Sequence, residues 1–129
     1  MTNLNFTDQE KDLLNSAGIS MLVLFGSQAQ NISSPASDYD ILVFGPDTKK
    51  SYDLVYDLLS GKIQKLVDID IVFASVAPGE LLNHASTYGQ VLYAKSPVDF
   101  ANFRQKVMLD YSDFAPYRYL FQQATLARI

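Results

Sequence analysis

A Gly-Ser pair after a buried strand, followed at a fixed distance by two spaced aspartates, constrains this chain more than any other feature. Five apolar residues, 21–25, run into Gly26 and Ser27, and ten residues later Asp38 and Asp40 open a second apolar run. Gly26 permits a sharp turn and the close approach of a ligand. Ser27 offers a hydroxyl and a backbone N–H of the kind that binds phosphate. The pattern predicts a phosphate-binding turn between two buried strands.

Carboxylates are predicted to face this turn. Asp38 and Asp40 are two residues apart on a strand, so both side chains point to one face. A later strand carries Asp68 and Asp70 on one face and aliphatic residues on the other. Neighbouring carboxylates suit Mg²⁺, which binds a few of them together with phosphate oxygens. Three carboxylates from two strands predict a two-metal phosphoryl- or nucleotidyl-transfer site, in which one carboxylate acts as general base.

Caps and breakers predict the element order α-β-β-α-β-α-β-α, which indicates an α+β fold (α/β two-layer) with a small mixed sheet packed against helices. A capping box, Thr7 to Glu10, begins the first helix. The expected strands are 21–25, 39–44, 67–74 and the short piece 90–94, with a polar loop at 27–37. The expected helices run from Thr7 to about Ser16, from Asp47 or Thr48 to about Ser60 where Gly61 ends the helix, from Pro78 to about Tyr88 where Gly89 ends it, and from Pro97 until Pro116 breaks it.

Length and composition limit the classes of protein this chain could be. We expect one domain over residues 1–129, with a helical, aromatic-rich C-terminal segment from about 97. Fourteen acidic against ten basic residues argue against binding to long nucleic acid. The absence of Cys excludes disulfide scaffolds and thiolate chemistry, and a single His leaves little room for His-based sites. Without a visible signal peptide or membrane-length apolar run, the expected compartment is the cytoplasm.

Taken together, the Gly26-Ser27 pair and the Asp38-Tyr39-Asp40 triplet resemble the signature of the DNA polymerase β-type nucleotidyltransferase superfamily. The size resembles its minimal members, the MNT domains of HEPN–MNT toxin–antitoxin pairs. Residues 89–93 also resemble a Gly-x-Val-Leu-Tyr piece of those proteins, and residues 110–114 resemble their Tyr-x-Asp-Phe tail. The resemblance covers roughly residues 18–118.

The resemblance implies a nucleotidyltransferase fold, Mg²⁺ (two ions) and ATP. For an MNT antitoxin it implies transfer of AMP from ATP to a tyrosine hydroxyl of a partner HEPN ribonuclease, which silences the toxin. Gly26 and Ser27 then bind the triphosphate, and Asp38 and Asp40 act as metal-binding catalytic residues. The third ligand is expected to be Asp70, since relatives often show an Asp followed by two aliphatic residues. Asp68 is the alternative ligand, or else a solvated residue or one that orients a ligand.

Departures from the family pattern keep other functions open. Gln28 and Gln30 stand where many relatives have Arg, and Asn31 stands where they have Gly. Fewer positive charges beside the phosphate turn favour a second hypothesis, an antitoxin of weak or no activity that acts by direct binding. A third keeps the chemistry with a small-molecule acceptor. The sequence gives neither the base preference nor the oligomeric state.

Several other residues have two interpretations. Lys62 and Lys65 could reach phosphates, although lysines at such positions are more often solvated. His84 is expected to be an ordinary helix residue. The C-terminal aromatic residues belong either to the core or to a partner interface; they are Phe100, Phe103, Tyr111, Phe114, Tyr117, Tyr119 and Phe121.

Overall fold

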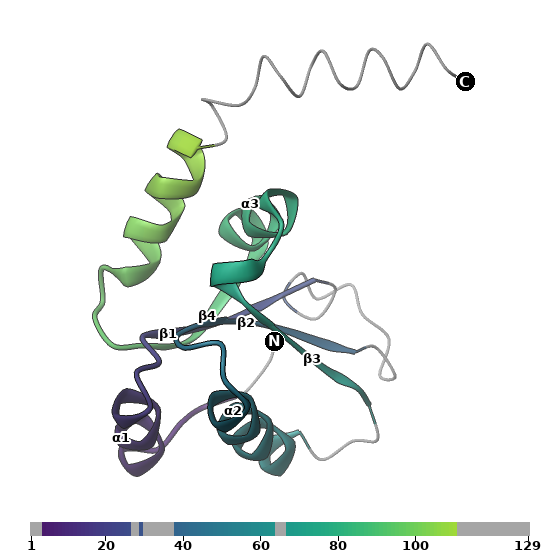
Figure 1. Ribbon diagram of the computed structural model, residues 1–129, viewed down its shortest axis with the longest axis vertical. Coiled ribbons are helices and arrows are strands. Elements are labelled where there is room, and N and C mark those ends of the chain that lie inside the picture. The colour runs from purple at the N-terminus through teal and green to yellow at the C-terminus, as the bar shows by residue number, and fades with distance from the viewer. Residues whose placement is uncertain (1–3, 27–28, 30–37, 64–66, 111–129) are drawn as a thin grey trace.

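The computed structural model describes residues 4–26, 29, 38–63 and 67–110. Its elements in chain order are α1 (Asp8–Ser16), β1 (Met21–Phe25), β2 (Tyr39–Phe44), α2 (Lys49–Lys62), β3 (Ile69–Phe73), the 3₁₀ turn η1 (Ala74–Val76), α3 (Gly79–Tyr88) and β4 (Gln90–Ala94). Residues 99–110 are helical and follow β4 (Figure 1). The predicted order of elements is confirmed.

The four strands form a mixed sheet in the order β3-β2-β1-β4. β1 pairs antiparallel with both β2 and β4, whereas β2 and β3 are parallel and are connected through α2. A parallel pair needs such a crossover connection, which α2 supplies. The expected α+β arrangement around a small mixed sheet is therefore confirmed.

Helices cover both faces of this sheet (Figure 1). α1 and α2 pack on one face, and α3 and the helix at 99–110 pack on the other. Every residue of β1 is buried, because the strand has a neighbour on each side and helices above and below it. Alternate residues of a strand serve opposite faces, so Leu22 and Leu24 join the first core whereas Met21, Val23 and Phe25 join the second.

Local sequence explains most of the helix ends. The capping box of α1 is present: the Thr7 N–H donates to Glu10 Oε1 at 2.8 Å, and the Glu10 N–H donates to Thr7 Oγ1 at 3.1 Å. Thr48 caps α2 by accepting from the Ser51 N–H. The prediction that Gly61 ends α2 is wrong. The helix continues to Lys62 and stops at Ile63, whose side chain is buried in the core.

Three other boundaries differ from the predicted ones. β3 is shorter than residues 67–74, because it begins at Ile69 and gives way to η1 after Phe73. Pro78 lies at the N-cap of α3, not inside its first turn. The last helix begins at residue 99, two residues after Pro97, where Asp99 accepts a hydrogen bond from the Ser96 N–H. Among the described residues, no helix has the length and apolarity to cross a membrane.

Candidate active site

Two carboxylates lie side by side where the sheet register brings three strands together. Phe25, the last residue of β1, is the register partner of Asp40 on β2, and Asp40 is the partner of Asp70 on β3. We call this edge, marked by Phe25, Asp40 and Asp70, the carboxylate end of the sheet. Because β2 and β3 are parallel and in this register, both aspartates project from the same face, the face that α3 covers.

Gly26 closes the turn against one of these carboxylates. Its φ of +77° lies in the left-handed region, which L residues with a side chain rarely adopt. A Cβ added at Gly26 would overlap Oδ2 of Asp40. The backbone therefore approaches the Asp40 carboxylate as closely as only glycine allows. Ser27, Gln28, Gln30 and Asn31 lie outside the described residues.

Asp40 is an aspartate of the site whose pKa is clearly shifted. Partial burial raises the pKa of its carboxyl above the ordinary value, and the charges of Asp70 and then Asp38 add to this rise, together with a hydrogen bond from Asp70. The imidazole of His84 acts in the opposite direction. Crowded carboxylates with a perturbed pKa are typical of functional sites, where a bound cation or a proton relieves the repulsion.

The other predicted acidic residues occupy different positions. Asp38 lies one residue before β2 and is exposed, yet close enough for its charge to act on Asp40. Asp70 is exposed within β3. Asp68 is exposed and lies one residue before β3, where its backbone carbonyl accepts the Tyr39 N–H at 3.0 Å. No charge of Asp68 is among the influences on Asp40.

Within the described part of the chain, no three acidic or histidine side chains form a ready-made metal-binding group. The donor chemistry nevertheless fits a divalent cation. Asp40 and Asp70 present hard oxygen ligands from neighbouring strands, and their mutual repulsion favours a positive charge between them. Gly26 itself places no side chain against the Asp40 carboxylate. Asp38 is the further carboxylate that acts on the pair.

The contacts of Lys62 and Phe103 decide between the two interpretations that the sequence leaves open for each of them. Lys62 forms an ion pair with Glu10 at 2.8 Å and lies over the Phe6 ring, 5.1 Å from its centroid. These contacts hold α2 to the segment at the N-terminus, on the face of the sheet opposite to the carboxylates. Lys65 lies outside the described residues. Phe103 is buried against Phe44 in an edge-to-face contact, so it belongs to the core.

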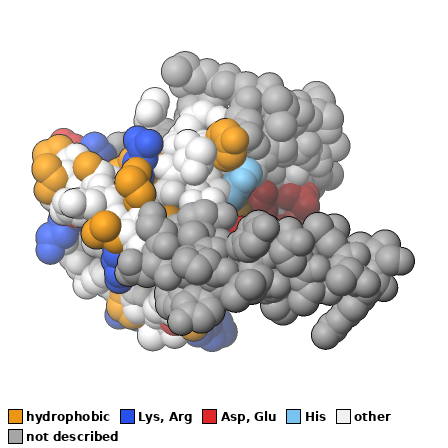
Figure 2. Space-filling model, turned by 90° about the horizontal axis from the view of Figure 1, so that it is seen from above, with side chains coloured by type: hydrophobic (Ala, Val, Ile, Leu, Met, Phe, Trp, Pro, Cys, Tyr) orange, Lys and Arg blue, Asp and Glu red, His pale blue; other side chains and the backbone are white. Residues whose placement is uncertain are grey.

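The sequence analysis missed the part that α3 plays in the site. His84 lies on α3 above Phe25, with ring centroids 6.4 Å apart, and influences Asp40. In the space-filling view the histidine borders a group of acidic side chains (Figure 2). Nothing in the local sequence marks His84, because its place depends on how α3 packs on the sheet.

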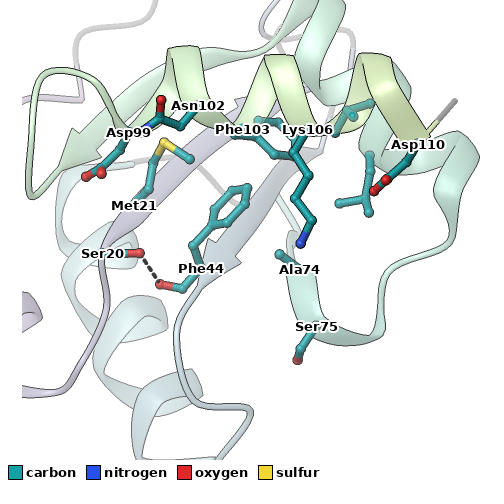
Figure 3. A pocket seen from close by; sticks show the side chains of 12 residues that line it. Ser20, Met21, Phe44, Ala74, Ser75, Asp99, Asn102, Phe103, Lys106 and Asp110 are labelled. Carbon is teal, nitrogen blue, oxygen red and sulfur yellow. Dashed lines mark hydrogen bonds between the residues drawn. The ribbon is translucent and has the colours of Figure 1, made fainter. Parts of the chain in front are cut away.

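A pocket of about 430 Å³ lies at the other end of the sheet. Its floor includes Met21 and Phe44, which are register partners at the end opposite to the carboxylates, and its roof is the helix at 99–110 (Figure 3). Lys106 projects into it between acidic residues of the same helix. The register therefore separates this pocket from the carboxylate end by the full length of β1.

A family comparison covers most of the chain. The model of the family described as polymerase beta nucleotidyltransferase matches residues 9–98. This span includes Gly26 and all four aspartates considered above. A search of curated proteins gives no match.

Solved structures with the same fold are components of toxin–antitoxin complexes. One, described as a toxin–antitoxin with AMP-PNP, is 23% identical, with 93% of this chain and 99% of that chain covered and a TM-score of 0.71. A mutant MntA–HpeT toxin–antitoxin is 21% identical, with 97% and 99% covered and a TM-score of 0.73. A complex of tri-AMPylated HEPN toxin with MNT antitoxin from Shewanella oneidensis is 19% identical, with 92% and 97% covered and a TM-score of 0.63. At these identities the likeness shows a shared fold.

Proposed function

Because this chain belongs to the polymerase beta nucleotidyltransferase family, we propose that it is a metal-dependent nucleotidyltransferase and the antitoxin of a HEPN–MNT pair. In this proposal it transfers AMP from ATP to a tyrosine hydroxyl of its partner HEPN ribonuclease and thereby neutralises the toxin. The observation that carries the proposal is the register of Asp40 beside Asp70, with Gly26 turning against Asp40.

Two of the structural neighbours support the choice of nucleotide and acceptor. One was solved with AMP-PNP, an ATP analogue, and another contains a HEPN toxin that carries AMP groups. Both match this chain over more than nine-tenths of its length. On this basis, the proposal assigns ATP as the adenylyl donor and a HEPN toxin as the acceptor for this chain.

In the proposed site, Asp38, Asp40 and Asp70 would hold Mg²⁺, with Asp68 as the alternative third ligand. The metal supplies charge neutralisation of the phosphates and increased acidity of the attacking hydroxyl. Gly26, with its open left-handed turn, and Ser27 would seat the triphosphate through backbone N–H groups and a hydroxyl. The turn would therefore bind phosphate, and the carboxylates on or beside the strands would bind the metal.

In the proposed transfer, each bond that forms is matched by a bond that breaks. The tyrosine oxygen forms a bond to the α-phosphorus of ATP, the bond from that phosphorus to the bridging oxygen breaks, and pyrophosphate leaves. The hydroxyl proton passes to a strand carboxylate, which acts as general base.

A second candidate function, neutralisation by contact alone, is favoured by the apolar surface of the last helix. Met108 and Leu109 on that helix, and Val98 just before it, are more than half exposed. Exposed apolar side chains gathered on one helix are typical of protein interfaces. This surface also suits an enzyme that must hold its protein substrate, so activity has to decide between the two functions.

Labelled ATP separates the candidates. The protein is incubated with Mg²⁺, its HEPN-type partner and ATP labelled either at the α-phosphate or at the γ-phosphate. Nucleotidyl transfer predicts that only the α-label reaches the partner, that Asp40→Asn abolishes labelling, and that the exposed control Asp57→Asn does not. Absence of α-label on the partner while the two proteins still bind each other would favour contact neutralisation.

A further inference from the structure

An aromatic pair on α3 stands beside the carboxylate end of the sheet. His84 and Tyr88 are four residues apart on the helix, so their side chains share one face. Their ring centroids are 5.1 Å apart, with the planes tilted by 49°. Neither the fold nor the proposed transfer chemistry requires an aromatic pair at these two positions.

The pair connects to the site through His84. Its ring meets Phe25 in an edge-to-face contact, and Phe25 is the register partner of Asp40. His84 therefore forms part of the wall above the carboxylates, on the face of the sheet that α3 covers (Figure 1).

Tyr88 continues this wall at the end of α3. α3 ends at Tyr88, and β4 then begins with Gln90, the register partner of Leu24, at the carboxylate end. The side-chain amide of Gln90 donates to the carbonyl oxygen of Ala29, which lies just beyond the Gly26 turn. A hydrogen bond therefore ties the start of β4, two residues after Tyr88, to Ala29.

The exposure of Tyr88 is unusual for an aromatic ring so near the core. Half of its surface is accessible, whereas Tyr93, five residues later, is almost fully buried. A partly exposed ring that another ring contacts on one side still offers a flat apolar surface to a ligand. Bases of nucleotides stack on such surfaces, because every base has a π-face.

We propose that His84 and Tyr88 form the platform on which the heterocyclic base of the bound nucleotide stacks. The assignment rests on the proposed function, since it assumes a triphosphate seated at the Gly26 turn. A nucleotide held there by its phosphates has to lay its nucleoside along an adjoining wall. The end of α3 adjoins the site, because His84 contacts Phe25 beside Asp40 and Tyr88 contacts His84. Stacking reads the face of the base and not its edge, so the platform favours purines over pyrimidines but separates ATP from GTP only weakly.

The platform can be tested by binding alone, with Mg·ATP and Mg·tripolyphosphate as probes in isothermal titration calorimetry. Tyr88→Ala is expected to weaken ATP binding roughly fivefold or more and to leave tripolyphosphate binding unchanged. Tyr88→Phe keeps the ring without the hydroxyl and should bind both probes as the wild type does. Tyr56→Ala, which removes a tyrosine that is 41% exposed from α2 on the other face, is the matched control.

Other outcomes would overturn the platform in distinguishable ways. Unchanged ATP binding by Tyr88→Ala would show that the ring does not carry the base. Equal loss of ATP and tripolyphosphate would assign Tyr88 a structural role, which circular dichroism would confirm. Label transfer, measured separately, tests the enzyme: a platform that binds ATP without transfer would refute the proposed reaction and leave the platform standing, whereas failure of the wild type to bind ATP would refute both.

Discussion

Asp40 and Asp70 are direct register partners on the parallel strands β2 and β3, and Asp70 raises the pKa of the Asp40 carboxyl by its charge and by a hydrogen bond. Two carboxylates held together in this way repel each other and lower the stability of the folded state. Proteins keep such unfavourable local arrangements chiefly at functional sites. The pair is therefore the feature of the fold that most needs a function to explain it.

The first prediction concerns pH. The pKa of Asp40 is raised in the folded state, so the stability it contributes is complete below its ordinary pKa, about 4, and is lost as pH rises through the raised value. The amide of Asp40→Asn cannot ionise, so without metal the melting temperature of this variant should rise relative to that of the wild type as pH increases above about 4. Melting curves recorded at increasing pH test this prediction. Mg²⁺ should reduce the difference in melting temperature between the variant and the wild type. A difference independent of pH would contradict the assignment.

The second prediction concerns the turn. Gly26→Ala places a side chain in a left-handed conformation, at a cost of about 1–2 kcal/mol, and drives its Cβ into Asp40 Oδ2. Both unfolding free energy and nucleotide transfer should fall. Gly61→Ala is the matched control: its Cβ meets no atom within 4 Å in α2, and alanine in a helix should stabilise by about 0.5–1 kcal/mol. Equal behaviour of the two variants would refute a special role for Gly26.

A third prediction separates the two interpretations of Lys62. Its ammonium pairs with Glu10 and lies over the ring of Phe6, so Lys62→Met should lower the melting temperature modestly and leave transfer unchanged. Glu10→Gln should have a similar effect on melting, because both changes break the same pair. Loss of transfer in Lys62→Met but not in Glu10→Gln would instead show that the lysine reaches phosphate.

The last helix gives a fourth prediction, in which core and surface positions respond differently. Phe103 is buried edge-to-face against Phe44 at 4.8 Å, so Phe103→Ala should destabilise the protein by about 3–5 kcal/mol. Met108 is 65% exposed, so Met108→Ala should change stability by less than about 0.5 kcal/mol and weaken binding to the HEPN-type partner. Undiminished partner binding by Met108→Ala would exclude this surface from the interface.

Local signals in the sequence were sufficient for most of the fold. The strands 21–25, 39–44 and 90–94 match β1, β2 and β4 because glycine or charged residues mark their ends. The end of α2 was predicted wrongly at Gly61, because glycine is tolerated in the last turn of a helix. The burial of Ile63 decides where α2 stops. β3 was predicted too long because Val67 and Asp68 continue the alternating pattern, although the paired residues of β3 begin only at Ile69.

The site was less predictable because its geometry depends on contacts between distant segments. The sequence marked Asp40 and Asp70 as candidates, but their pairing rests on the register of β2 against β3. The place of His84 depends on the packing of α3 over Phe25. Neither relation leaves a local trace in the sequence, since each is set by strand pairing or by helix packing across the core.

The intact mass of the HEPN-type partner, after incubation with this protein, ATP and Mg²⁺, tests the proposed adenylyl transfer. The partner should gain one or more whole AMP units, located on tyrosine, with the wild type but not with Asp40→Asn. An unmodified partner that still forms a complex with a folded wild-type protein would refute adenylyl transfer.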